Sequence, residues 1–200
     1  GAPTAAELGW RMSIQCWSFN SSTFFESVDR AARMGVTCIE MFPGQKIGGD
    51  FPDVGTDQGM SPEAKQAIKA KLQETGIQVV NFGVTGIPGD EAGRRQLFDW
   101  AKDMGIETIC AEPDPNELPG LDPWCAEYSI NIALHNHPKP SRYWNPQTVL
   151  DACKGLSTRM GACADTGHWM RSGINPLDAI TLLEGRIVTF HFKDLNTMGP

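Results

Sequence analysis

The strongest constraint on the fold is an alternation of short apolar strands and helices along the chain. Seven stretches have the composition of buried strands, and they begin near Met12, Thr37, Gln78, Thr108, Ile130, Met160 and Arg186. The steps between them are roughly 20 to 40 residues, about the size of one strand–helix unit. Ser61, Asn145 and Asn175 each precede a proline, which is a typical start of a helix. The pattern predicts an α/β fold built on parallel strands.

Two architectures fit this alternation, an open doubly wound sheet and a (β/α)8 barrel. No G-x-G-x-x-G motif follows the first predicted strand, which disfavours the dinucleotide-binding form of the open sheet. Polar or aromatic residues end nearly every predicted strand, namely Gln15, Trp17, Glu40, Asn81, Glu112, His135, Asp165 and His191. A barrel builds its site from all of its strand ends, so we favour a (β/α)8 TIM barrel.

The length of the chain bears on how much of a barrel it can form. It has 200 residues, whereas about 250 is typical of this fold. No eighth strand is recognisable after the seventh. We therefore expect residues 1–200 to form one barrel domain that lacks its eighth strand, and we expect the natural protein to continue beyond Pro200. The glycine-rich connection from Gly44 to Met60 is expected to fold over the barrel mouth as a lid.

All four histidines of the chain lie at the ends of three predicted strands. His135 and His137 end one strand, His191 ends another, and His168 follows Asp165 by three residues at the end of the third. Imidazole and carboxylate groups are ligands that suit Mn, Fe, Co, Ni or Zn. We therefore predict that His135, Asp165 and His191 bind a divalent metal ion, namely Mn, Co, Zn or Fe. The alternative for any one histidine is a hydrogen-bonded polar group at a strand end.

Three further residues are predicted to be catalytic, namely Glu112, His168 and Lys193. Glu112 ends the fourth predicted strand, where a carboxylate can abstract a proton next to a carbonyl or bind a sugar hydroxyl. His168 is placed to reach a substrate oxygen, and Lys193 to polarise a carbonyl. The alternative for Glu112 is a salt bridge to Lys46 or Lys193. The alternative for Lys193 is a solvated pair with Asp194.

Aromatic residues gather at the predicted strand ends and in the loops after them. Flat apolar faces beside hydrogen-bonding groups are how proteins hold sugar rings. The predicted substrate-binding residues are Trp17, Glu40, Gln45, His137 and Trp169.

Composition narrows the range of partners. The formal net charge of −7 argues against a nucleic-acid-binding protein, which needs a basic face. No apolar run approaches the roughly 18 residues of a membrane-spanning helix, and no amphipathic polybasic segment indicates binding to a membrane surface. We expect a small-molecule sugar substrate, no nucleic acid and no membrane partner, while assembly into a homo-oligomer stays open.

The six cysteines lack the spacing of a zinc cluster. Cys38, Cys110 and Cys163 fall inside predicted strands, where cysteine usually acts as a small hydrophobe. The chain begins Gly-Ala-Pro without an initiator methionine, as a mature protein does after removal of a signal peptide. This start favours an exported or periplasmic location over a cytoplasmic one.

Five motifs carry a resemblance to a known family. They are I-Q-C-W-S-F at 14–19, I-E-M-F-P-G-Q-K at 39–46, A-L-H-N-H-P at 133–138, D-T-G-H-W at 165–169 and H-F-K-D at 191–194. Together they resemble the xylose isomerase-like (β/α)8 proteins, the sugar phosphate isomerase/epimerase superfamily, over essentially the whole chain. The resemblance implies a divalent metal held by strands five to eight, with Asp165 and His191 at ligand positions and His168 in contact with substrate.

The chain departs from the family pattern at two positions. Family epimerases usually carry a glutamate on strand five, where this sequence has His135. The strand-eight glutamate, a ligand and proton shuttle in those epimerases, is not among the 200 residues. Both departures bear on which metal is bound and which reaction is catalysed.

The resemblance and the residues lead to one main functional prediction and two alternatives. The prediction is a metal-dependent isomerase or epimerase of a small sugar or keto sugar, in which a proton moves next to a metal-polarised carbonyl. One alternative in the same fold is a hydratase, dehydratase or lyase acting on keto sugars or inositols. The other is a non-catalytic sugar-binding barrel. The apurinic endonuclease branch of the superfamily is disfavoured, because it needs more histidines and a basic face.

Overall fold

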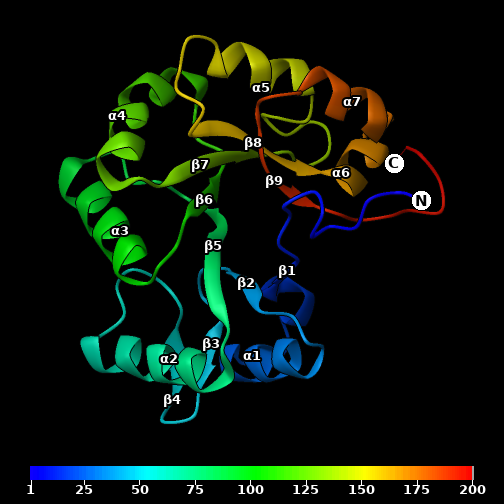
Figure 1. Cartoon of the computed structure of the whole chain (residues 1–200). Coiled ribbons are helices and arrows are strands. Elements are labelled where there is room, and N and C mark those ends of the chain that lie inside the picture. Colours follow the sequence, from blue (N-terminus) through cyan, green and yellow to red (C-terminus); the bar gives the residue numbers. More distant parts are fainter. Residues whose placement is uncertain (200) are drawn as a thin grey trace. The chain divides into compact units, whose positions relative to one another are not determined.

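The computed structural model describes residues 1–199 and divides into two compact units (Figure 1). The first unit contains residues Gly1–Gly83 and Asp103–Ile106, and the second contains Val84–Lys102 and the described residues from Glu107 onward. Within the described residues, no helix has both the length and the apolar character needed to cross a membrane.

The first unit is built on three parallel strands, β1 (Ser13–Gln15), β2 (Cys38–Met41) and β5 (Gln78–Thr85), of which β5 ends in the second unit. β1 pairs with β2, and β2 pairs with β5. The helical elements are η1 (Cys16–Phe19), α1 (Phe24–Arg33) and α2 (Pro62–Thr75). Phe24, Val28 and Ile68 on the two α-helices are fully buried in the core of this unit.

Local capping explains where the two helices of the first unit begin. At α1, the Thr23 hydroxyl accepts the backbone N–H of Glu26, and the Glu26 carboxylate accepts the backbone N–H of Thr23. This reciprocal pair satisfies two amides that have no partner inside the helix. At α2, Ser61 caps the helix by accepting the N–H of Ala64, and Pro62 occupies the first turn.

The glycine-rich connection from Gly44 to Met60 contains regular structure that the sequence did not indicate. It forms an antiparallel hairpin of β3 (Lys46–Gly48) and β4 (Phe51–Gly55). The backbone has a positive φ of 92° at Gly48 and 58° at Gly49, a conformation that L side chains rarely adopt, so glycine permits the tight turn. A role as a lid stays a prediction.

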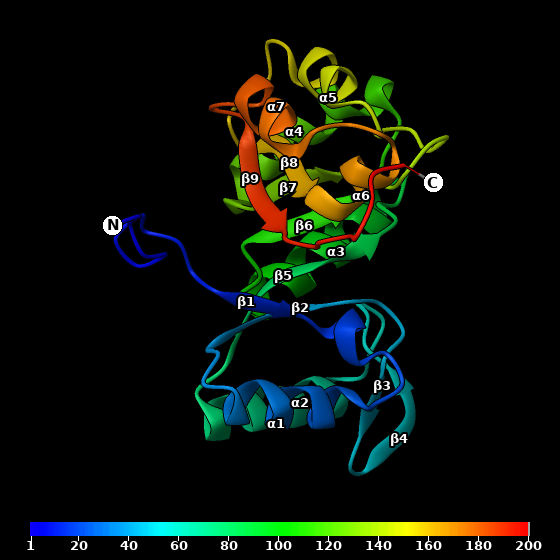
Figure 2. The ribbon, with the colours of Figure 1, turned by 90° about the vertical axis from the view of Figure 1, so that its right-hand side faces the viewer.

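The second unit contains four parallel strands in the order β6 (Thr108–Ala111), β7 (Asn131–His135), β8 (Met160–Asp165) and β9 (Ile187–His191). Its helical elements are α3 (Glu91–Asp103), whose last residue lies in the first unit, η2 (Pro115–Glu117), α4 (Leu118–Tyr128), α5 (Pro146–Cys153), α6 (Thr166–Arg171) and α7 (Pro176–Leu182). α4 and α5 pack against β8, and α6 leaves the end of β8 and lies against β9 (Figures 1 and 2).

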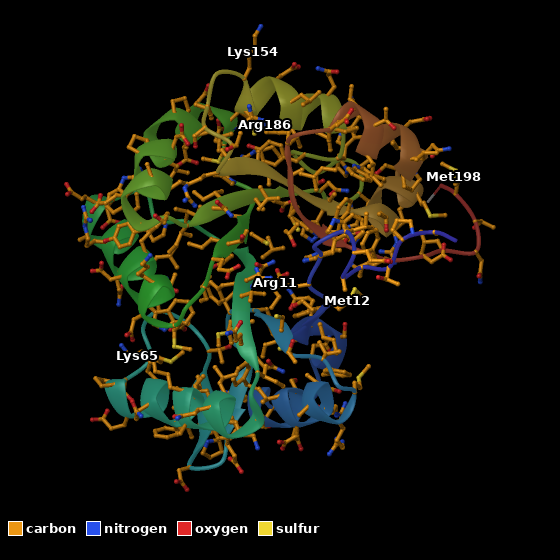
Figure 3. All side chains as sticks on the ribbon, viewed as in Figure 1. Arg11, Met12, Lys65, Lys154, Arg186 and Met198 are labelled. Atoms are coloured by element: carbon orange, nitrogen blue, oxygen red, sulfur yellow. The ribbon has the colours of Figure 1, made fainter. Side chains whose placement is uncertain are left out.

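Two residues set how closely β8 and β9 approach. A Cβ on Gly161 of β8 would lie 2.2 Å from the carbonyl oxygen of Arg186, so only glycine fits beside the start of β9. The Arg186 guanidinium, labelled in Figure 3, donates to the carbonyls of Ser157 and Met160 at 2.8 and 3.0 Å. These contacts hold together the two strands whose opposite ends carry the candidate site.

Parallel strands alternate with helices through both units, as the sequence predicts. The parallel strands among residues 1–199 are β1, β2, β5, β6, β7, β8 and β9. An eighth parallel strand is not found in this described part of the chain. The succession is that of a (β/α)8 barrel through its seventh strand, so the predicted α/β fold class is confirmed.

Candidate active site

The candidate site lies in the second unit, at the carboxyl ends of β7, β8 and β9. His135, Asp165 and His191 are the last residues of these three strands. The register places Asp165 opposite His191, and His135 opposite Cys163. Because parallel strands end at the same edge of a sheet, their terminal side chains are brought together. His135 Nε2 lies 3.4 Å and His191 Nδ1 3.8 Å from Asp165 Oδ2.

Asp165 is the centre of this cluster and is fully buried. Its Oδ1 accepts the backbone N–H of His168 at 2.9 Å, which caps α6, so the strand end and the helix start share one side chain. Burial alone raises the pKa of Asp165. Hydrogen bonds from His135 and Lys193 outweigh burial and hold that pKa well below its usual range. Asp165 is therefore a carboxylate at neutral pH.

Lys193 provides the shortest contact to the buried carboxylate, with Nζ 2.8 Å from Asp165 Oδ2. Thr166 fixes the lysine backbone, because its hydroxyl accepts the Lys193 N–H and donates to the Lys193 carbonyl. Gly167 permits this approach, since a Cβ there would lie 2.6 Å from Lys193 Cβ. The partner of Lys193 is therefore Asp165, whereas Asp194 caps the backbone N–H of Leu195.

Asn136 is a site residue that sequence reasoning missed. It is buried, and its side-chain amide donates to the Asp165 carbonyl at 2.9 Å while its side-chain oxygen accepts the Asp165 N–H at 2.7 Å. These two bonds fasten the ends of β7 and β8 to each other. The only signal in the sequence was the position of Asn136 between His135 and His137 in the H-N-H motif.

His168 lies beside Asp165 in the first turn of α6 and is buried. Its Nδ1 lies 2.9 Å from the backbone carbonyl of Asn136 and therefore carries the proton, because a carbonyl can only accept. Burial lowers the pKa of His168 to about 4, although the charge of Asp165 acts in the opposite direction. At neutral pH, His168 is an uncharged imidazole whose Nε2 is a hydrogen-bond acceptor.

Glu112 follows β6 and forms an ion pair with His137. Its Oε1 lies 2.9 Å from His137 Nδ1 and 3.4 Å from the His137 backbone nitrogen. Burial acts to raise the pKa of Glu112, but the hydrogen bond and charge of His137 are stronger and lower it. The same hydrogen bond raises the pKa of His137. The partner that the structure shows for Glu112 within the second unit is thus His137, whereas Lys193 pairs with Asp165.

A cavity of about 430 Å³ lies beside Glu112. Its lining residues are Val84, Thr85, Gly86, Ile87, Glu112, Pro113, Glu117 and Arg142. Arg142, from the loop between β7 and α5, donates to the Glu112 carbonyl at 2.7 Å. The sequence carried no signal for Arg142, because its place in the wall depends on how that loop folds.

The four histidines and Asp165 provide two sets of ligand atoms for a metal ion. In one set, His135, Asp165 and His191 each offer an atom within 4.8 Å of the others, and in the second set His135, His137 and His168 do so. The first set combines imidazoles with one carboxylate, which suits a divalent transition metal. The Lys193 ammonium also contacts the Asp165 carboxylate. A metal ion bound by this first set would therefore replace Lys193 as the positive charge beside Asp165.

The remaining predicted substrate-binding residues lie in different surroundings. Trp17, Glu40 and Gln45 belong to the first unit. Trp17 is 60% exposed and contacts Phe42 edge-on, whereas Glu40 and Gln45 are buried, and Gln45 Nε2 donates to Ser27 Oγ at 2.9 Å. Substrate contacts by these residues stay predictions.

Trp169 lies in α6 beside His168 and is 1% exposed. Its side chain therefore contributes to the core of the second unit. Whether Trp169 also contacts a substrate stays a prediction.

Comparison with known proteins supports the family resemblance. The family model described as xylose isomerase-like TIM barrel matches residues 28–199. Among curated proteins, none matches the sequence at a significant level. The solved structure of an uncharacterised protein from Parabacteroides distasonis ATCC 8503 is 32% identical, with a TM-score of 0.79, and the match covers 93% of this chain and 75% of that chain.

Two other solved structures share the fold at low identity. The 3-keto-D-glucoside 4-epimerase YcjR from E. coli is 15% identical with a TM-score of 0.65, over 92% of this chain and 80% of that chain. The IOLI protein, solved with a bound zinc atom, is 15% identical with a TM-score of 0.68, over 94% of this chain and 74% of that chain. The family match spans most of the chain and agrees with the order of its strands and helices. This chain therefore belongs to the xylose isomerase-like TIM barrel family.

Proposed function

We propose that this chain is an isomerase or epimerase that moves a proton at the carbon next to the carbonyl of a small sugar or keto sugar. The observation that carries the proposal is the Glu112–His137 ion pair, which borders a polar cavity and lies beside the cluster around Asp165. A base, a set of groups that can stabilise negative oxygen and a space for a small ligand are the parts that this reaction requires. An epimerase of keto sugars among the structural neighbours supports the reaction class.

Glu112 is the proposed base. Its lowered pKa keeps it ionised at neutral pH, and the hydrogen bond from His137 orients its carboxylate. In the reaction, Glu112 takes the proton from the carbon next to the carbonyl, and the electron pair of the broken C–H bond forms an enolate. Return of the proton from Glu112 to the neighbouring carbon, with passage of the adjacent hydroxyl proton to the former carbonyl oxygen, moves the carbonyl. Delivery of a proton from a second acid, such as water, to the opposite face inverts the first carbon instead, and Glu112 then gives its proton to solvent.

A carboxylate with a lowered pKa is a weak base toward carbon. General acid–base groups contribute about 10²- to 10⁴-fold, so stabilisation of the enolate oxygen must supply much of the remaining acceleration. The Lys193 ammonium is the group that we propose to stabilise the negative charge on the enolate oxygen. Neutral His168 is the proposed partner of a substrate hydroxyl, because its Nε2 can accept a hydrogen bond from that hydroxyl.

His135, Asp165 and His191 would hold a divalent ion, for which Mn, Co, Zn and Fe are the candidates. Such an ion, when bound, polarises a carbonyl and an adjacent hydroxyl. The zinc atom of the IOLI protein supports an ion in this fold. Trp17, Glu40, Gln45, His137 and Trp169 stay candidates for contacts to the sugar.

Hydrogen exchange tests the proposal directly. The purified chain is incubated in D₂O, with each candidate divalent metal, against a panel of ketoses and keto sugars, and NMR follows loss of the C–H signal next to the carbonyl. We expect exchange with at least one sugar and a loss of about 10²- to 10⁴-fold in Glu112→Gln. The control is Glu117→Gln, since Glu117 lines the same cavity and a glutamine retains its hydrogen bond to the Asp114 N–H.

Other outcomes identify the alternatives. Loss of water from a keto sugar or inositol would make the chain a dehydratase. Saturable binding of a sugar without exchange or any product would make it a sugar-binding protein. Equal exchange rates for Glu112→Gln and the unmodified chain would remove Glu112 from its proposed role.

A further inference from the structure

A second group of metal-binding side chains lies inside the second unit. It contains Cys110 on β6, Cys163 on β8 and His191 at the end of β9. One ligand atom from each lies within 4.8 Å of the other two. Both cysteines are fully buried and pack with Ala133 of the intervening strand β7, whereas the His191 side chain is 10% exposed. Cys110 and Cys163 have no part in the function proposed above.

The position of the two thiols argues against a disulfide. Cys110 pairs with Ala133, and Ala133 pairs with Gly161, so β7 separates the strands that carry the two cysteines. Neighbouring strands lie about 4.8 Å apart, which puts the two Cα atoms about 9 Å apart or more. A disulfide requires a Cα–Cα distance of about 4.4–6.8 Å. Oxidation to a disulfide would therefore require the strands to move.

A metal ion can bridge the distance between Cys110 and Cys163, which is too long for a disulfide. Zinc binds thiolate sulfur at about 2.3 Å and imidazole nitrogen at about 2.0–2.1 Å, so two sulfur ligands of a tetrahedral site lie about 3.8 Å apart. The ligand atoms of this group lie at most 4.8 Å from one another, so the distance between the two sulfur atoms needs to shorten by about 1 Å or less to bind zinc. Two cysteines, one histidine and a water complete a tetrahedral coordination sphere. Ala133 lies beside the two thiols, and the partly buried Val188 packs against the same cluster.

We propose that Cys110, Cys163 and His191 form a second cation site, selective for a sulfur-preferring ion such as Zn²⁺ or Cd²⁺. Thiolate ligands favour such ions over Mn²⁺, which prefers oxygen and nitrogen ligands. The site shares His191 with the set that includes His135 and Asp165. An ion held by the thiols therefore competes for His191, and excess Zn²⁺ or Cd²⁺ inhibits turnover supported by Mn²⁺. This last consequence rests on the proposed function, whereas the binding of the ion does not.

Cobalt(II) tests the site without any measurement of turnover, because thiolate coordination gives an intense sulfur-to-cobalt charge-transfer band. The unmodified chain titrated with Co²⁺ is expected to develop this band. Cys110→Ala and Cys163→Ala are each expected to lose most of it. The matched control is Cys153→Ala, because Cys153 is also a fully buried cysteine but lies on α5, outside the cluster. This control is expected to keep the band.

X-ray absorption of the zinc-loaded unmodified chain decides the question if the variants fail to fold. The proposal expects sulfur neighbours at about 2.3 Å, whereas a site of histidines and Asp165 gives only nitrogen and oxygen at about 2.0–2.2 Å. Bound zinc without sulfur neighbours, or a charge-transfer band that survives in both cysteine variants, would overturn the proposal. Sulfur coordination without hydrogen exchange on any sugar would support this site and contradict only the proposed function.

Discussion

Lys193 Nζ lies 2.8 Å from Asp165 Oδ2, so the buried carboxylate at the centre of the candidate site is neutralised by an ammonium group of the same chain. Asp165 is fully buried, whereas the Lys193 side chain is 47% exposed. An isolated charge in such a position is costly, and pairing removes much of that cost. A cation bound by His135, Asp165 and His191 would therefore share the Asp165 carboxylate with the lysine ammonium.

The first prediction concerns Lys193→Met, which removes the ammonium and leaves the Asp165 charge uncompensated. Breaking a fully buried pair costs about 3–5 kcal/mol, and the exposure of Lys193 reduces this to roughly 1–3 kcal/mol of unfolding free energy. Added divalent metal is expected to stabilise this variant more than the unmodified chain, because the ion replaces the lost charge. Denaturant unfolding with and without metal measures both effects. Lys154→Met, at an exposed lysine labelled in Figure 3, is the control, and an equal response of both variants would contradict the prediction.

The second prediction concerns Asp165→Asn. Asparagine caps helices as well as aspartate does, so α6 is expected to keep its start at this residue. The variant loses the only carboxylate in the set with His135 and His191, and manganese content after dialysis against Mn²⁺, an ion that thiolates do not favour, is expected to fall to background. Elemental analysis and the unfolding midpoint are measured together. Retained metal with a collapsed midpoint would show that Asp165 serves stability and not metal binding.

The third prediction is that His168 and His137 titrate on opposite sides of the usual histidine pKa of 6.5. Burial lowers the pKa of His168 to about 4, and the Glu112 hydrogen bond raises that of His137. Imidazole NMR signals, assigned with His168→Gln and His137→Gln, are followed from pH 3.5 to 9 in metal-free protein. A His168 signal that titrates near 6.5 would be inconsistent with its burial beside the Asn136 carbonyl.

These shifts also fix how each histidine makes stability depend on pH. Between pH 6.5 and about 4, the unfolded chain protonates His168 and the folded chain does not, so stability falls as the pH is lowered through this range. The contribution of His137 has the opposite sign. It is complete below pH 6.5 and is lost as the pH rises through the raised pKa of the folded protein.

The fourth prediction concerns Gly161→Ala on β8. The new Cβ would lie 2.2 Å from the Arg186 carbonyl oxygen, so β8 and β9 must separate. Overpacking of this kind costs about 1–3 kcal/mol, measured as the change in unfolding free energy. The control is Gly120→Ala in α4, where a Cβ meets nothing within 4 Å and alanine is expected to stabilise the helix by about 0.5–1 kcal/mol. Similar effects from the two substitutions would refute the close approach of the strands.

The sequence alone determined the features that depend on neighbouring residues. The caps at Thr23 and Ser61 are contacts across three residues, so the starts of α1 and α2 follow from local patterns. The alternation of strand and helix predicted parallel strands, and parallel strands end at one edge. The meeting of His135, Asp165 and His191 was therefore predictable, although the residues are far apart in the chain.

The tertiary structure alone decided which side chains meet within that edge. From the sequence, Glu112 could equally form a salt bridge to Lys46 or Lys193 or contact a substrate. The fold of the loop after β7 instead brings His137 to it. Asn136 and Lys193 gain their roles around Asp165 only from the pairing of β7, β8 and the segment after β9. Strand register determines such contacts, because a slip of one residue turns every side chain to the other face, and no pattern within three or four residues encodes it.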